Sequence, residues 1–77
     1  MINKILKTMR KKANITQLEM SKKCNIANST LSGYEVGYRE PDFKTIEQIA
    51  NICGYEIIFK NKNGDILTTK NIARKEI

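Results

Sequence analysis

The residue types that enzymes and metal sites depend on are scarce in this sequence. The 77-residue chain contains no histidine, and its two cysteines, Cys24 and Cys53, lie far apart. These facts exclude the usual zinc-binding spacings and any catalysis by an imidazole base. No cofactor-binding loop and no pairing of a nucleophile with a base emerges from the other residues. We therefore expect a protein that is not an enzyme and that uses neither a metal nor a cofactor.

The chemistry that remains is the recognition of an anion. The net charge is +6; residues 1–40 carry eight lysines and arginines against three acidic residues, and residues 41–77 carry six against five. A basic N-terminal part suits a phosphate backbone, because each neutralised phosphate releases counterions. The alternative is a lysine-rich surface that is merely solvated, and composition alone leaves both interpretations open.

The expected location is the cytoplasm. Both cysteines stand at the ends of apolar helical patterns, which favours buried, reduced thiols. No apolar run approaches the roughly 18 residues of a membrane span, and residues 1–12 lack the apolar core of a secretory signal. We expect no membrane partner.

The elements that would position a binding site are mainly helical. A chain of this length supports one core, and that core is marginal, so a partner subunit is a reasonable expectation. The first helix is expected from apolar residues at helical spacing, with lysines and Arg10 between them. Those apolar residues are Ile2, Ile5, Leu6, Met9 and Ala13.

The second helix has the best-defined start. Thr16 can cap it, Glu19 completes a capping box, and Ile15 can pack on Met20. Its end is expected near Cys24, because the next residue, Asn25, tolerates the left-handed conformation.

The third helix is expected over residues 27–36, with Leu31 and Tyr34 inward and Gly37 ending it. Asp42 can cap a fourth helix, which Gly54 closes. The inward side of that helix is expected to hold Phe43, Ile46, Ile49, Ala50 and Cys53.

A change from helical to strand-like period follows at Tyr55. Residues 55–60 and 65–70 are rich in β-branched and aromatic residues and flank an Asn-Gly turn. This arrangement predicts a β-hairpin, which must pack on something to be stable. Residues 71–77 give no clear signal.

Two short helices joined by a turn of three to four residues form a helix-turn-helix, and this one has the small Ser21 and the turn residue Asn25 where that geometry needs them. Over residues 5–54 the chain resembles the XRE-like group of regulators, which includes the lambdoid phage repressors and Cro proteins. The resemblance implies a four-helix, lambda-repressor-like DNA-binding domain over residues 1–54. Residues 55–77 then form the hairpin extension, the expected dimerisation element, and a tail. It is carried by Arg10, Thr16, Gln17, Met20, Ser21, Ser29, Thr30, Leu31, Ser32, Tyr34, Glu35, Gly37, Arg39, Pro41, Thr45, Ile49, Ala50 and Gly54.

By this resemblance the third helix is the recognition helix of a double-stranded DNA-binding protein. Asn28 and Ser29 are expected to contact base edges, with Ser32 reaching further into the groove. The alternative for Asn28 and Ser29 is helix capping. Two departures weaken the readout: Gly33 stands where relatives carry a long polar side chain, and Ala27 replaces a frequent serine cap.

Other residues are expected to hold the DNA backbone or the fold. Gln17 matches the family's phosphate-clamping glutamine, at a helix N-terminus that already favours an anion. The resemblance also implies that Arg10 and Glu35 form a structural ion pair. Further phosphate contacts are expected from exposed residues that flank the groove, each of which could instead be merely solvated: Thr30, Tyr38, Arg39 and Lys44.

The leading functional hypothesis is a repressor that binds a palindromic operator as a homodimer, paired through strand residues Tyr55, Ile57, Ile58 and Phe59. The alternative for the hairpin is that it covers its own core. Two alternatives remain for the function. One is an antitoxin that represses its own operon and neutralises a partner toxin, and the other is a protein-interaction module that binds no DNA.

Overall fold

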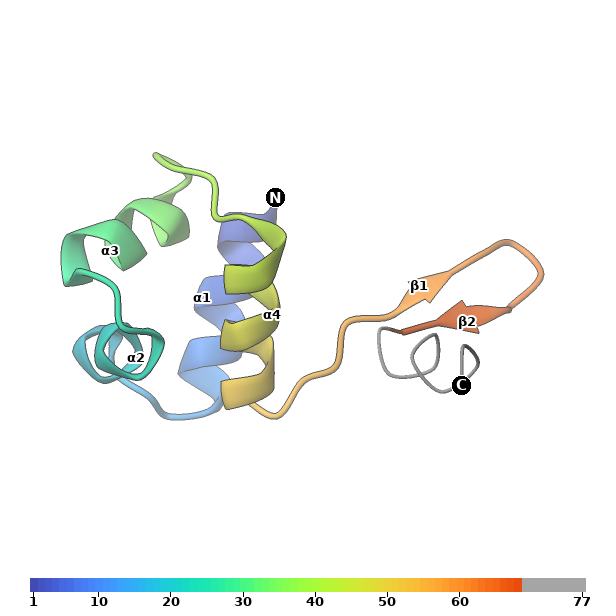
Figure 1. Cartoon of the computed structure of the whole chain (residues 1–77), viewed down its shortest axis with the longest axis horizontal. Helices are drawn as coiled ribbons and strands as arrows, with labels where there is room; N and C mark the ends of the chain where they lie inside the picture. Colours follow the sequence, from blue (N-terminus) through green and yellow to red (C-terminus); the bar gives the residue numbers. More distant parts are fainter. Residues whose placement is uncertain (69–77) are drawn as a thin grey trace.

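The computed structural model describes residues 1–68. Four helices, α1 (Ile2–Lys12), α2 (Gln17–Cys24), α3 (Asn28–Val36) and α4 (Phe43–Ile52), precede two short strands, β1 (Phe59–Lys60) and β2 (Ile66–Leu67) (Figure 1). The strands pair antiparallel, with Phe59 opposite Leu67 and Lys60 opposite Ile66. The expected fold class, a mainly α chain of four helices followed by a β-hairpin, is confirmed.

The start and end of α2 follow the predicted local chemistry. The Thr16 hydroxyl accepts a hydrogen bond from the Glu19 amide at 3.1 Å, and the Glu19 carboxylate accepts one from the Thr16 amide at 2.8 Å. At the other end Asn25 is left-handed, with φ 56°. The capping box and the predicted turn residue are both confirmed.

The ends of α3 and α4 are set by one glycine and one aspartate. Gly37 ends α3 in the left-handed region, with φ 87°, and Asp42 caps α4 by accepting a hydrogen bond from the Thr45 amide at 2.9 Å. The N-cap of α3 is Ala27, which makes no side-chain cap bond. This helix therefore begins at Asn28, one residue later than predicted.

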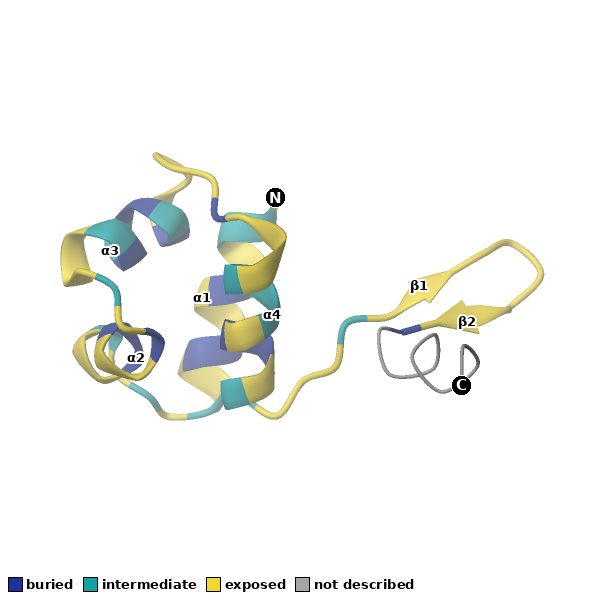
Figure 2. Cartoon of the chain, in the orientation of Figure 1, coloured by how far each residue is buried: buried dark blue, intermediate teal, exposed yellow. Residues whose placement is uncertain are grey.

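The four helices enclose one core. α1 and α2 each pack against α3 and α4, and the buried residues lie on the facing sides (Figure 2). Most of the predicted inward positions are confirmed. The buried apolar residues are Leu6, Met9, Met20, Cys24, Leu31, Ile49 and Ala50.

The prediction of a buried position is wrong for two apolar residues. Ile5 is 48% exposed and Phe43 is 45% exposed. Both line an open apolar groove of about 360 Å³ along α1 and α4, which nothing in residues 1–68 fills. Helical spacing identified their apolar face but not whether another element covers it.

The hairpin is shorter than predicted and lies beyond α4, away from the other helices (Figure 1). Residues 55–58 were expected in the first strand, but they pair with no strand among the described residues. In the turn, the Asn61 carbonyl accepts from the Gly64 amide at 3.1 Å, and Gly64 has φ 90°. The end of the second expected strand, residues 69–70, lies outside the described residues, as does the rest of the tail.

Both cysteines are free thiols; Cys24 is buried and Cys53 is half-buried. Burial raises the pKa of both thiols, and at Cys24 the charge of nearby Cys53 acts in the same direction. Across residues 1–68, no helix has the length and apolar character needed to cross a membrane.

Candidate DNA-binding interface

The helix-turn-helix is formed by α2, the three-residue turn 25–27, and α3. Buried Ser21 donates from its hydroxyl to the Leu18 carbonyl at 2.7 Å, and its own carbonyl accepts from the Ile26 amide at 3.0 Å. The small side chain therefore lies where the turn meets α2. α3 lies at the outside of the helical part, on the side opposite the hairpin (Figure 1).

The first turn of α3 presents polar side chains to solvent. Asn28 and Ser29 are exposed, and Ser32, one turn further along, is half-buried. Neither Asn28 nor Ser29 caps the helix, because the N-cap position belongs to Ala27. Their amide and hydroxyl groups are therefore free to bond to an external partner.

Gln17, the first residue of α2, is held by a partner that the sequence did not reveal. Its side-chain amide donates to Glu35 Oε1 at 3.2 Å. An amide has two N–H donors and a carbonyl acceptor, so this bond leaves donor capacity for a phosphate. The contact ties the N-terminus of α2 to the last turn of α3.

Arg10 and Glu35 form a buried pair between α1 and α3. Arg10 Nε donates to Glu35 Oε2 at 2.6 Å and Nη2 donates to Oε1 at 2.9 Å, while Nη1 donates to the Ile15 carbonyl at 2.8 Å. Burial acts to raise the pKa of Glu35, but hydrogen bonds from Arg10 and Gln17 and the charges of Arg10 and Lys7 outweigh it and lower that pKa. The hydrogen bond to Glu35 raises the pKa of Arg10. The lowered pKa of Glu35 and the raised pKa of Arg10 favour the ionised pair, whose side chains are buried.

The other candidate phosphate ligands lie on α3, in the loop that follows it, and on α4. Thr30 is half-buried on α3, Tyr38 and Arg39 are exposed in the loop that follows it, and Lys44 is exposed in the first turn of α4. Tyr38 is 86% exposed, so the fold does not use its ring. Tyr38 and Arg39 thus follow α3 directly in the chain, whereas Lys44 lies on the next helix, α4.

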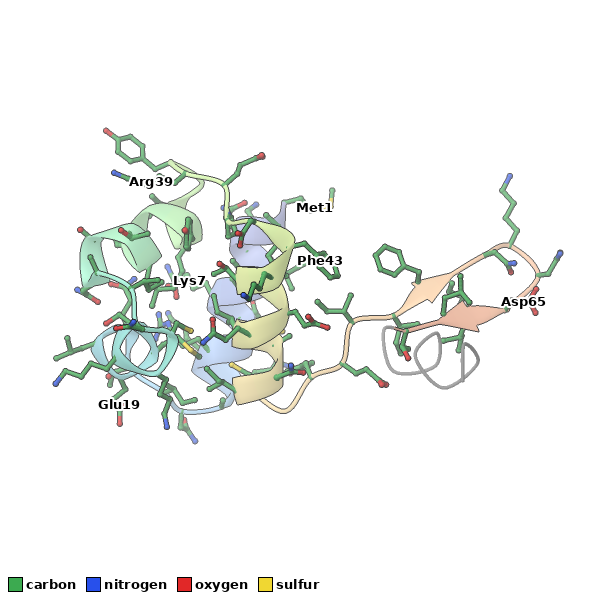
Figure 3. All side chains as sticks on the ribbon, viewed as in Figure 1. Met1, Lys7, Glu19, Arg39, Phe43 and Asp65 are labelled. Atoms are coloured by element: carbon green, nitrogen blue, oxygen red, sulfur yellow. The ribbon has the colours of Figure 1, made fainter. Side chains whose placement is uncertain are left out.

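Two contacts at the end of α3 were missed by the sequence analysis. Arg39 extends from the loop back over α3 and lies against Gly33 (Figure 3). Asn3 of α1 donates from its side chain to the Glu35 carbonyl at 3.4 Å. No sequence signal marks Asn3, whereas a glycine inside a helical pattern can mark a close packing contact.

The fold and the site define the class of protein. The model of the Helix-turn-helix family matches residues 6–59, and the chain belongs to this family. It is an XRE-like, DNA-binding transcriptional regulator, which confirms the resemblance found in the sequence.

Two relatives from Bacillus subtilis (strain 168) are described as HTH-type transcriptional regulators. The chain is 36% identical to the HTH-type transcriptional regulator ImmR over 85 aligned positions, which cover 99% of this chain and 67% of ImmR. It is 42% identical over 52 positions to the uncharacterized HTH-type transcriptional regulator YqaE, covering 68% of this chain and 45% of YqaE. No solved structure matches.

Proposed function

We propose that the chain is a repressor that binds a palindromic DNA operator as a homodimer and blocks transcription by occupying the promoter. The observation that carries this proposal is the pair of exposed polar residues, Asn28 and Ser29, in the first turn of an outward-facing α3. Residues in the first turn of a recognition helix are the ones that reach base edges in the major groove.

The proposed roles follow from side-chain chemistry. The Asn28 amide would bond to adenine N6 and N7, and the Ser29 and Ser32 hydroxyls would each serve one base. The backbone ligands would fix the register and supply affinity without choosing the sequence. These are Gln17, Thr30, Tyr38, Arg39 and Lys44.

We assign residues 1–54 to DNA binding and residues 55–77 to dimerisation. The support is apolar surface: Tyr55, Ile58 and Phe59 are exposed, while Ile57 packs on the core. Tyr55 and Ile57 also line the open groove between α1 and α4. Binding to two half-sites requires the α3 helices of the dimer to lie about one DNA turn, roughly 34 Å, apart. The names of the two relatives lend no support to the antitoxin alternative with its toxin partner.

The DNA contacts are tested by binding the purified protein to genomic fragments, sequencing the bound fraction, and repeating the binding with variants at two salt concentrations. Asn28→Ala should relax the preference at one base position, whereas Gln17→Ala should weaken all sites. Lys44→Ala should lower the salt dependence, and Lys62→Ala, the same change in the distant hairpin turn, should not. Absence of enrichment and of salt dependence would remove the DNA-binding proposal.

The dimer is tested by sedimentation equilibrium. Phe59→Asp places a charge in the proposed interface and should yield monomers that retain the helical circular dichroism. Lys60→Asp, at the adjacent position of β1, should leave the dimer in place. A monomeric parent protein would contradict the proposed dimer while leaving the DNA contacts of one subunit open to test.

A further inference from the structure

Gly33 is buried in the middle of α3, and its surroundings are filled by a side chain from another segment. A Cβ atom at this position would lie 3.1 Å from Arg39 Cδ and 3.2 Å from Arg39 Cγ. Carbon atoms in good contact are about 3.5–4.0 Å apart. The Arg39 stem therefore lies closer to position 33 than an ordinary contact with a Cβ atom, and a side chain there would have to displace it.

The backbone holds Arg39 in this place independently of its side chain. The Gly33 carbonyl accepts hydrogen bonds from the Tyr38 amide at 2.8 Å and from the Arg39 amide at 3.1 Å. The Gly37 amide donates to the same carbonyl and ends the helix. This converging set brings the Cα of Arg39 beside α3, and from there its side chain runs past position 33.

We infer that Gly33 is a positioning residue for DNA binding: by lacking a side chain it lets Arg39 lie across α3, where the Arg39 guanidinium serves as a donor of the recognition surface. Position 33 supplies no side chain of its own, and the Arg39 stem lies over it instead. The inference rests on the proposed function, because it assumes that this face of α3 meets DNA.

The group that Arg39 binds is a hydrogen-bond acceptor of DNA, either a phosphate oxygen or the O6 and N7 atoms of guanine. Arginine suits both through its planar fork of N–H donors. A phosphate contact adds to the salt dependence of binding without sequence preference. A guanine contact instead confers a preference at one base position.

The test compares Gly33→Leu, Gly33→Ala and Arg39→Met in fluorescence anisotropy titrations of the enriched duplex and of a random-sequence duplex. Leucine fills the path of the Arg39 stem and cannot bond to DNA, whereas methionine keeps the stem without the charge. We expect Gly33→Leu and Arg39→Met each to weaken binding about tenfold, the size of one charge-assisted contact. Gly33→Ala should weaken it less, and adding Gly33→Leu to Arg39→Met should have no further effect.

Salt and sequence identify the acceptor. If both variants lower the slope of log K against log salt by about 0.9, the acceptor is a phosphate; if they relax one base position instead, it is guanine. Val36→Leu, at an exposed position of the same helix, should change neither quantity. Circular dichroism and thermal unfolding show whether each variant folds. If Gly33→Leu does not fold, Gly33→Ala takes its place in the binding comparison.

The inference is overturned if Gly33→Leu binds as the parent does, or if it loses affinity equally in the Arg39→Met background. Asn28→Ala and Gln17→Ala, measured in parallel, separate this failure from that of the proposed function. If those two variants weaken binding while the position-33 variants do not, α3 meets DNA and Gly33 has no part in it.

Discussion

Arg10 and Glu35, 25 residues apart in the chain, form a two-pronged ion pair that joins α1 to the recognition helix. Glu35 also accepts from Gln17, so one carboxylate links the last turn of α3 to the start of α2. The pair is buried, and its exposure is 11% for the Arg10 side chain and 2% for that of Glu35. The pair thereby joins α1, α2 and α3 through one buried carboxylate.

Removing one member of this pair should destabilise the fold strongly. Arg10→Ala would leave the buried Glu35 charge without its main partner, a change that costs about 3–5 kcal/mol. Urea unfolding followed by circular dichroism measures the loss. Lys11→Ala changes the next residue of α1, which is exposed, and should change the free energy of unfolding by less than about 0.5 kcal/mol. Equal effects of the two substitutions would show that the pair contributes nothing special.

The same pair predicts a loss of stability in acid. The fold lowers the pKa of Glu35, whereas the unfolded chain has a glutamate pKa of about 4.3. The stabilisation that ionised Glu35 gives the fold is therefore complete above its unfolded pKa, and it is lost as the pH falls through the lower, folded pKa.

The midpoint of urea unfolding, measured from neutral to acidic pH, tests this predicted loss of stability, with Glu35→Gln as the comparison. The variant should be less stable at neutral pH but should lose less on acidification. The variant should still lose some stability in acid, because hydrogen bonds also lower the pKa of two other carboxyl groups. These are Glu19, which is bonded to the Thr16 amide, and Asp42, which is bonded to Thr45. Parallel curves for parent and variant would contradict the assigned role of Glu35.

The local chemistry of the chain was predictable because it depends on neighbours in the sequence. The Thr16 and Glu19 capping box, the left-handed Asn25 and the cap at Asp42 each involve residues within one helical turn. The exposure of Ile5 and Phe43 was not predictable, because it depends on whether a distant element covers the groove. The placement of Arg39 over Gly33 likewise depends on the path of the loop after α3, which no local rule fixes.

The candidate site was predictable in part. The polar residues of α3 were found from the resemblance, since the helix-turn-helix fixes which side of α3 faces outward. The bond from Gln17 to Glu35 joins two helices across the fold and left no mark in the sequence. Side chains that meet through tertiary packing need the structure to be seen together.

The recognition helix should accept a better N-cap. Ala27 already has the extended backbone of a cap, with φ −66° and ψ 146°, but its side chain has no acceptor. Ala27→Ser should stabilise the fold by about 1 kcal/mol, because its hydroxyl can accept from an amide in the first turn. Thr16→Ala should destabilise it by a similar amount, and Thr16→Ser should have little effect. Thermal unfolding measures all three, and an unchanged midpoint for Ala27→Ser would refute the prediction.

The hairpin should be coupled to the helices through one aromatic contact. The rings of Phe43 at the start of α4 and Phe59 in β1 have centroids 6.3 Å apart and planes inclined by 29°. Aromatic pairs of this kind contribute about 0.5–1.5 kcal/mol beyond their buried area. A double-mutant cycle of Phe43→Leu and Phe59→Leu should therefore give a coupling energy in that range, measured by urea unfolding at a fixed protein concentration. The control cycle pairs Phe43→Leu with Leu67→Ala, the residue opposite Phe59 in the hairpin, and should give a smaller coupling energy. Coupling near zero in both cycles would mean that β1 does not rest on α4 in solution.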